Sequence, residues 1–88
     1  NKYIGGWLND LRHGYGKEIF STGNRYEGEY RNNKFHGYGK YFFITGETYS
    51  GEYKFGKRNG KGTNIWPNRN KYSGEFLNEK RHGNGIFT

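Results

Sequence analysis

Three histidines occupy equivalent places in a short cluster that recurs along the chain, each followed by the pattern Gly-x-Gly. They are His13, His36 and His82. Grouped imidazoles are common zinc ligands, so a metal site is the first chemistry that the pattern suggests. The third cluster, however, carries Asn59 instead of histidine, and equivalent atoms on neighbouring hairpins lie about 10 Å apart, too far to share one ion. We therefore expect structural histidines that bond backbone groups near a turn, and no metal.

The glycines of the same cluster have the spacing found in phosphate-binding loops. The four Gly-x-Gly pairs begin at Gly14, Gly37, Gly60 and Gly83. A loop of that kind needs a helix directly after it, because the amides of the first helical turn contact the phosphate. The chain holds 16 glycines spread along its length, which strongly disfavours helix. We expect the glycines to shape turns and leave room for adjacent aromatic rings, and we expect no cofactor.

The remaining reactive side chains show no catalytic arrangement. Ser21, Ser50 and Ser73 have no His or Asp at a fixed spacing, and the chain has no Cys that could act as a nucleophile. One column of acids recurs, at Glu29, Glu52 and Glu75. We interpret it as charge pairing with basic residues of neighbouring strands on a solvent-exposed face. The segment is therefore expected to have no catalytic residue and no enzymatic activity.

All these residues belong to one pattern that recurs every 23 residues. It starts at Tyr3, Tyr26, Tyr49 and Tyr72, each with Gly two residues later and an aromatic residue two further on. A fixed period of this length is typical of repeat architectures. We therefore expect residues 1–88 to form one array with repeats 3–25, 26–48, 49–71 and 72–88, the last truncated, and to be a fragment of a longer protein.

Each repeat has the pattern of a β-hairpin. In the second repeat Tyr26, Gly28 and Tyr30 alternate with Glu27 and Glu29, the period of two that marks a strand. Residues that tolerate positive φ follow and predict a turn. The predicted turns are Asn9-Asp10, Asn32-Asn33-Lys34, Phe55-Gly56 and Asn78-Glu79. A second strand comes next, as at residues 15–20 and 38–43.

Another turn joins each repeat to the next. It contains Thr22-Gly23 after the first repeat and Thr45-Gly46 after the second. After the third repeat Arg69 replaces the glycine and follows Pro67-Asn68. Since glycine adopts positive φ without strain, we expect this third loop to differ in conformation from the other two.

A single hairpin is only marginally stable in water, so the hairpins must cover one another. We predict an all-β fold, a single-layer antiparallel sheet of about eight strands made of stacked β-hairpins in an open repeat array. A closed barrel is the alternative. The open array is favoured because it explains a strict repeat without specialised ends. Aromatic residues make up 20% of the chain and must supply most of the buried surface.

The aromatic columns are also the candidate partner-binding surface. A single-layer sheet has two faces, and an exposed aromatic strip is what a partner would bury. We expect structural and binding roles to overlap in these columns. The candidate partner-binding residues are Trp7, Phe20, Tyr30, Phe43, Tyr53, Trp66 and Phe76.

Basic residues give the chain a formal net charge of +7, which attracts anionic partners over a distance. Most of the excess lies in the third repeat. The candidate anion-contacting residues are Lys54, Lys57, Arg58, Lys61, Arg69 and Lys71. A basic column also follows the turns, at Arg12, Lys34, Lys57, Arg58, Lys80 and Arg81. Stacking would place that column along one rim, as an anionic contact or as a solvated edge that discourages aggregation.

The combination Tyr-x-Gly-x-aromatic with His-Gly-x-Gly, in register at a 23-residue period, resembles the MORN repeat. The resemblance extends from Tyr3 to Thr88 as three full repeats and the hairpin of a fourth. It departs from the family pattern at Asn59, and only Gly56 retains the glycine that the family often has in the turn. The resemblance implies the open array of hairpins and a place in ciliary radial spokes, cytoskeletal scaffolds, membrane junctions or the accessory domains of enzymes.

Three functions from different classes follow, in descending order of preference. The first is a non-enzymatic scaffold that binds an elongated protein partner through the aromatic columns. The second is peripheral binding to acidic phospholipid, which the basic third repeat supports and which is also attributed to the family. The third is single-stranded nucleic acid, which the acidic column and the neutral second and fourth repeats disfavour. We expect a cytoplasmic location, at a cilium, the cytoskeleton or a membrane surface.

Overall fold

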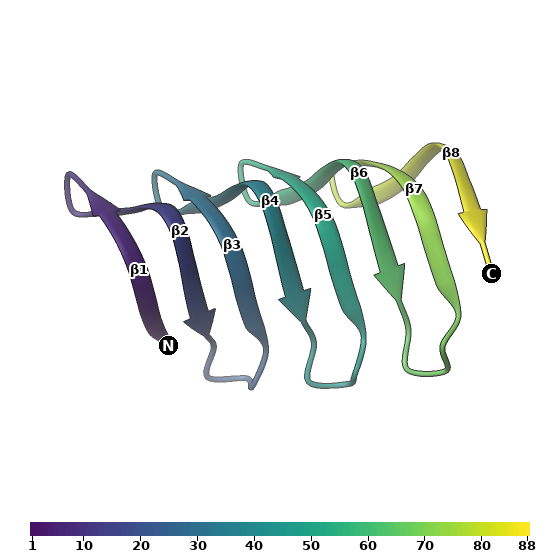
Figure 1. The fold of residues 1–88 in the computed structure, drawn as a ribbon, viewed down its shortest axis with the longest axis horizontal. Helices are drawn as coiled ribbons and strands as arrows, with labels where there is room; N and C mark the ends of the chain where they lie inside the picture. The colour runs from purple at the N-terminus through teal and green to yellow at the C-terminus, as the bar shows by residue number, and fades with distance from the viewer.

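The protein, described over residues 1–88 by a computed structural model, consists of eight β-strands and no helix (Figure 1). The strands are β1 Lys2–Leu8, β2 Leu11–Ile19, β3 Arg25–Arg31, β4 Lys34–Phe42, β5 Thr48–Lys54, β6 Lys57–Ile65, β7 Lys71–Leu77 and β8 Lys80–Phe87. They form one sheet whose spatial order follows the chain, and every neighbouring pair is antiparallel. The predicted open array of hairpins is confirmed, since β1 and β8 are the two edges. No element is a helix long and apolar enough to cross a membrane.

Two-residue turns close the four hairpins within the stretches predicted from the sequence, except that Lys34, predicted in the second turn, is the first residue of β4. In the first turn Asn9 has a φ of 51° and Asp10 a φ of 63°, and both central residues of the other turns also have positive φ. This is the type I′ geometry, whose twist matches that of the two strands it joins. Asparagine tolerates it well, but Phe55 at 50° and Glu79 at 76° adopt it too.

The three loops between repeats share one conformation, so the prediction that the third would differ is wrong. Gly23 and Gly46 have φ values of 98° and 102°, and Arg69 takes the same place with a φ of 72°. Each donates its N–H to the carbonyl of the residue three before it, at 2.9–3.0 Å. The surrounding ladders hold Arg69 in the left-handed region that glycine occupies in the other two loops.

Each repeat is built around a tyrosine ring that lies across a pair of facing glycines. In the second repeat Gly28 and Gly39 are directly opposite each other on β3 and β4. A Cβ added at either glycine would overlap the facing backbone or the Tyr26 ring above it. The Tyr26 hydroxyl donates a hydrogen bond to the carbonyl of Glu29 at 2.8 Å. The equivalent bonds of the other repeats are Tyr3 to Gly6, Tyr49 to Glu52 and Tyr72 to Glu75.

These tyrosines continue into one uninterrupted chain of aromatic rings along the array. The ring of each tyrosine packs edge to face against the aromatic ring at position 5 of its own repeat, counted from the tyrosine. Tyr3, Tyr26 and Tyr49 pack in the same way against that ring of the following repeat. The ring centroids are 5.1–5.5 Å apart and the planes meet at 80–89°. This arrangement is the preferred one for aromatic pairs. The order of the rings is Trp7, Tyr3, Tyr30, Tyr26, Tyr53, Tyr49, Phe76 and Tyr72. Six of the eight are buried and form the core: Tyr26, Tyr30, Tyr49, Tyr53, Tyr72 and Phe76.

The second strand of each hairpin bends sharply near its start, as Figure 1 shows for β2, β4 and β6. The bend falls near glycines with φ values between 63° and 95°, namely Gly14, Gly37, Gly60 and Gly83. In a straight strand, residues six apart would be about 20 Å from each other. Here the Arg12 Nη1 lies only 2.6 Å from the Glu18 Oε1. Both side chains lie on the aromatic side of the sheet, so the aromatic face is concave.

Replacing Tyr26 by alanine is expected to destabilise the protein by about 3–5 kcal/mol, because the ring is fully buried against aromatic neighbours on both sides. Tyr3→Ala is the matched comparison, since that ring is only partly buried and has a single neighbouring repeat. Urea unfolding followed by circular dichroism measures both. Equal losses of stability at the two positions would contradict the stacked core.

Arg69→Gly is expected to stabilise the protein by about 1 kcal/mol, because a residue other than glycine is strained in the left-handed region. The side chain of Arg69 is exposed and makes no hydrogen bond that the change would remove. Thermal unfolding compares this variant with the parent chain. Arg69→Ala serves as the control, since it removes the charge but keeps the strained backbone; a gain of the same size there would refute the explanation.

Candidate functional site

The concave face carries a groove that runs along the array, perpendicular to the strands. We number the positions of each repeat from its first tyrosine, which is position 1. Three columns form the groove beside the aromatic chain. Position 10 holds Arg12, Phe35, Arg58 and Arg81; position 16 holds Glu18, Tyr41, Asn64 and Phe87; position 18 holds Phe20, Phe43 and Trp66. The residues of these columns differ between repeats, so each junction between repeats has its own chemistry.

The arginines at position 10 lie over the rings of the aromatic chain. The guanidinium carbon of Arg12 is 5.6 Å from the centre of the Tyr3 ring, and that of Arg58 is 5.5 Å from the centre of the Tyr49 ring. In the second repeat Phe35 takes this place and stacks on Tyr26 with centroids 3.8 Å apart. These contacts are cation–π and stacking interactions. The prediction that the arginines stand on the rim with the lysines is therefore wrong.

The junction between the first and second repeats is filled by a polar network. Glu18, which is only 4% exposed, pairs with Arg12 at 2.6 Å and accepts a hydrogen bond from the Tyr30 hydroxyl at 2.9 Å. Burial and this bond to a carboxylate raise the pKa of Tyr30. A buried carboxylate is tolerated because both partners satisfy it. At this junction the groove is therefore occupied by the protein's own charged side chains.

The junction between the second and third repeats is a hollow of about 250 Å³ with an apolar lining. Its walls include Phe35, Tyr41, Phe43 and Tyr53, with Gly56 at the turn. The Tyr41 and Phe43 rings touch, with centroids 4.7 Å apart. No ion pair joins the residues at positions 10 and 16 of this repeat, and the half-buried Tyr41 and Phe43 rings remain available for contact.

The junction between the third and fourth repeats is a larger hollow, of about 480 Å³, with charged walls. Arg58 forms an ion pair with Glu79 at 3.4 Å and donates to the amide oxygen of Asn64 at 3.2 Å. Glu47, Trp66 and Arg81 complete the lining together with Phe76 and Lys80. The ion pair of Arg58 and Glu79 also borders the apolar hollow, so the two hollows are adjacent parts of one groove.

The predicted partner-binding aromatics divide into two groups. Three are buried within the chain and leave almost no surface for a partner: Tyr30 at 3%, Tyr53 at 7% and Phe76 at 4% exposure. The other four remain accessible: Phe20, Phe43 and Trp66 are half-buried, and Trp7 is 60% exposed. The column at position 18 is therefore the accessible part of the predicted aromatic surface.

The six predicted anion-contacting residues are not brought together into one patch. Lys54 and Lys57 flank the hairpin turn of the third repeat, whereas Arg69 and Lys71 lie at the opposite ends of the strands, beside the loop between repeats. Lys61 projects from the convex face, where its backbone N–H bonds Glu52. Arg58 is already paired inside the groove. Five of the six are exposed, but they point to three different parts of the surface.

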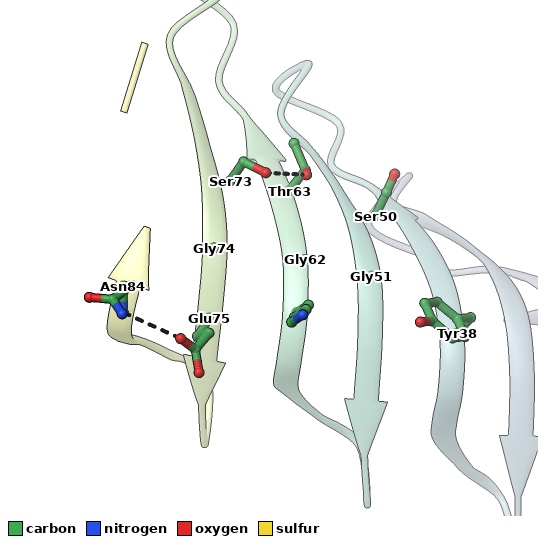
Figure 2. A pocket seen from close by; sticks show the side chains of 10 residues that line it. Tyr38, Ser50, Gly51, Gly62, Thr63, Ser73, Gly74, Glu75 and Asn84 are labelled. Atoms are coloured by element: carbon green, nitrogen blue, oxygen red, sulfur yellow. Dashed lines mark hydrogen bonds between the residues drawn. The ribbon is translucent and has the colours of Figure 1, made fainter. Parts of the chain in front are cut away.

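Figure 2 shows a shallow pocket between Tyr38 and Asn84 on the convex face, lined mainly by polar residues and glycines. Thr63 and Ser73 share a hydrogen bond of 3.2 Å there. The acidic column does not pair with basic side chains as predicted. Its carboxylates accept hydrogen bonds from backbone N–H groups: Glu29 from Tyr38, Glu52 from Lys61 and Glu75 from Asn84. Each amide directly follows one of the positive-φ glycines, so the acids hold the bend in the second strand.

The structural role predicted for the histidine position is confirmed in two repeats. The Nδ1 of His36 accepts a hydrogen bond from the Phe55 N–H at 3.3 Å, and Asn59 accepts one from the Asn78 N–H at 3.4 Å. Both bonds join a repeat to the turn of the next one. Asparagine can therefore replace histidine in the third repeat because each residue offers an acceptor at the same place.

Sequence reasoning missed position 10 and position 16 as groove residues. The signal was present at Phe35, since an aromatic residue in a column of arginines indicates that the column faces inward. Tyr41, two residues before Phe43, continues the same alternation. Nothing in the sequence indicated that residues six apart on one strand would meet, because this contact depends on the bend.

The geometry can now be compared with known proteins. A family model described as the MORN repeat matches residues 3–25, 26–48, 49–71 and 72–88. The chain belongs to the MORN repeat family. No curated protein shows a significant match to it. MORN repeats are non-enzymatic modules that generally interact with membranes or proteins.

The buried tyrosines predict loss of stability in alkaline solution. Burial raises the pKa of Tyr49 to about 12 and also raises those of Tyr26 and Tyr53. Their neutral form is favoured in the fold, so the stabilisation is complete below pH 10 and declines above it as the unfolded chain ionises. Each such tyrosine is expected to remove about 1.4 kcal/mol per pH unit above pH 10. Urea unfolding at pH 9 to 12 measures this decline; constant stability across that range would contradict it.

Proposed function

We propose that this MORN array is a protein-interaction scaffold whose concave groove binds an elongated protein partner lying across the strands. The observation that carries the proposal is the accessible aromatic column beside two adjacent hollows, at Phe43 and Trp66. Aromatic residues in partly enclosed pockets commonly supply most of the energy of a protein interface. No side chain in the groove is arranged for nucleophilic or acid–base chemistry, which agrees with a binding role.

The spacing of the column indicates how a partner would lie. Equivalent residues of neighbouring repeats are separated by two strand spacings, about 10 Å. A peptide in the polyproline II conformation presents every third side chain on the same side, about 9 Å apart, and a helix presents one about every two turns. The inner strands β2 to β7 are paired on both sides within the sheet, so a partner lying across them would be held by side chains and not by an added strand.

The two hollows differ in the side chain that they would accept. The hollow of about 250 Å³ beside Phe35, Tyr41 and Phe43 suits an apolar side chain. The hollow of about 480 Å³ beside Arg58 and Arg81 suits a polar or acidic one. The net charge of +7 would also favour encounter with an acidic partner. The proposed partner therefore carries an apolar residue and, about 10 Å further along, an acidic or amide residue.

The setting of this interaction rests on the family alone. MORN arrays resemble parts of ciliary and cytoskeletal assemblies, and we extend the proposal to a cytoplasmic assembly of that kind. Within it the array would act as a rigid strip that fixes the position of its partner. The support for rigidity is the continuous ladder of hydrogen bonds and rings over all eight strands.

A second candidate is peripheral binding to acidic phospholipid, and one feature of the convex face favours it. At the ends of the strands beside the loops between repeats, neighbouring residues alternate between apolar and polar, and the polar ones are cationic except for Thr48. The row is Lys2, Ile19, Arg25, Phe42, Thr48, Ile65 and Lys71. Ile19 is 50% exposed, and Arg25 covers the Phe42 ring at 4.3 Å. Basic residues with accessible apolar groups suit a membrane surface.

Two adjacent phenylalanines distinguish the candidates, because Phe43 faces the groove and Phe42 faces the convex side. Proteins captured from an extract of the source cells are measured for direct binding to the parent chain and to Phe43→Ala, Trp66→Ala and Phe42→Ala. We expect the groove variants to weaken binding by about 30-fold or more, and Phe42→Ala to retain it. Circular dichroism confirms that each variant is folded.

The lipid candidate is tested with the same variants on phosphatidylcholine liposomes with and without phosphatidylserine. If the array is a protein scaffold, little of the protein should sediment with either kind of liposome, and the groove variants should not change that amount. Strong binding that requires phosphatidylserine, decreases with salt and is lost in Phe42→Ala and Lys71→Gln but kept in Phe43→Ala would reverse the assignment in favour of lipid.

A further inference from the structure

The second, third and fourth repeats are each joined to the repeat before them through position 8, the second residue of the hairpin turn. At the first junction Asn33 donates its N–H to the carbonyl of Arg12, and its side-chain oxygen accepts from the N–H and the Nε of Arg12 at 2.7 and 3.3 Å. Glu79 makes the same three contacts with Arg58 at the third junction. At both junctions, therefore, a side chain at position 8 satisfies the backbone N–H of position 10.

The junction between the second and third repeats lacks this side chain. Gly56 stands at position 8 and donates its N–H to the carbonyl of Phe35 at 2.8 Å, but it offers no acceptor to the N–H of Phe35. The N–H and the carbonyl of a strand residue point to the same side, so the Phe35 N–H faces the place that the side chains of Asn33 and Glu79 fill at the other junctions. We call this place the Gly56 gap.

The Gly56 gap is open, and the backbone of the turn does not require it. Gly56 has a φ of 85°, but Asn33 and Glu79 adopt φ values of 70° and 76° at the same position. A Cβ added at Gly56 would meet no atom within 4 Å. The gap borders the apolar hollow of about 250 Å³, because Gly56 and Phe35 both line that hollow. A backbone donor without an acceptor therefore lies beside an apolar surface.

Positive charge without a partner is concentrated at the two hairpin turns that border the gap. Arg31 lies directly opposite Lys34 in the second hairpin, and Lys54 lies directly opposite Lys57 in the third. All four side chains are exposed, and none of them forms an ion pair. Like charges that face each other across two strands destabilise a sheet. An anion bound at the gap would reduce this repulsion.

We propose that the Gly56 gap binds a carboxylate of the protein partner, an Asp or Glu side chain that accepts the hydrogen bond of the Phe35 N–H. The inference rests on the proposed function, because it describes the partner of the same groove more closely. An amide oxygen would also satisfy the donor, but the four cations favour a carboxylate. The neighbouring residue of the partner is apolar and fills the hollow lined by Phe35 and Phe43. This carboxylate is additional to the polar residue expected about 10 Å further along, at the larger hollow.

The free donor is tested without any ligand, by amide hydrogen exchange of the isotope-labelled chain followed by NMR. Protection of the Phe35 N–H should be lower than that of the Arg12 and Arg58 N–H groups by about tenfold or more, because only those two are bonded. In Gly56→Asn the protection should rise to their level. Gly46→Asn is the matched control, since it makes the same change at another glycine of positive φ, and it should leave Phe35 unaffected. Equal protection of all three groups in the parent chain overturns the proposal.

Binding is measured with dodecapeptides selected on the parent chain from a random library displayed on phage. We expect the selected peptides to share an Asp or Glu beside a large apolar residue. Fluorescence anisotropy should show that Gly56→Asn, or alanine in place of the acid of the peptide, weakens binding by about tenfold or more. Gly46→Asn should bind like the parent chain, and Phe43→Ala should bind weakly. The Phe35 amide proton should shift downfield as the peptide binds.

The outcomes separate this site from the groove as a whole. Peptides that require Phe43 but bind Gly56→Asn as tightly as the parent chain overturn the carboxylate site and leave the scaffold in place. Peptides that bind independently of Phe43, or a library that yields no ligand, contradict the proposed function and this site with it. Sedimentation with phosphatidylserine liposomes that is lost in Gly56→Asn assigns the gap to a lipid headgroup instead. Circular dichroism verifies that each variant is folded, and the peptide series tests the carboxylate without any change in the chain.

Discussion

A tyrosine ring can lie flat across two strands only where neither strand carries a side chain beneath it. The facing glycines Gly28 and Gly39 provide that space for Tyr26, and the hydroxyl then reaches the Glu29 carbonyl. The remaining features follow from this contact. The ring is aligned to meet the aromatic residues on both sides, the glycines allow the strands to bend, and the bend makes the aromatic face concave. One such unit occupies 23 residues, which explains the period of the sequence.

In the proposed scaffold, one face of the single-layer sheet is both the core and the binding surface. The division falls between columns of that face: positions 1 and 5 are buried in the second to fourth repeats, and position 18 remains accessible. Positions 10 and 16 then set the character of each junction. The pair of Arg12 and Glu18 closes one junction, whereas Phe35 with Tyr41 leaves an apolar hollow at the next. Variation at two positions thus changes the ligand properties of the groove without touching the fold.

The sequence was sufficient for the strands, the hairpin turns and the tyrosine–glycine core, because these depend on neighbours close in the chain. Predictions from the sequence were wrong where the conformation of a residue depends on a part of the structure that is distant in the chain. Arg69 adopts a glycine conformation because the adjoining ladders impose it. Arg12 and Arg58 turn inward because of the bend. The acids bond backbone amides because the bend exposes those amides to Glu29 and Glu52.

The direction of the strands has a mechanical consequence. The molecule measures 41 Å in its longest dimension, and the strands run across this axis, so the hydrogen bonds between them lie along it (Figure 1). Tension applied from end to end would therefore load the bonds of one edge at a time, as in opening a zipper, and would not shear many together. The array would therefore yield to end-to-end tension one hairpin after another.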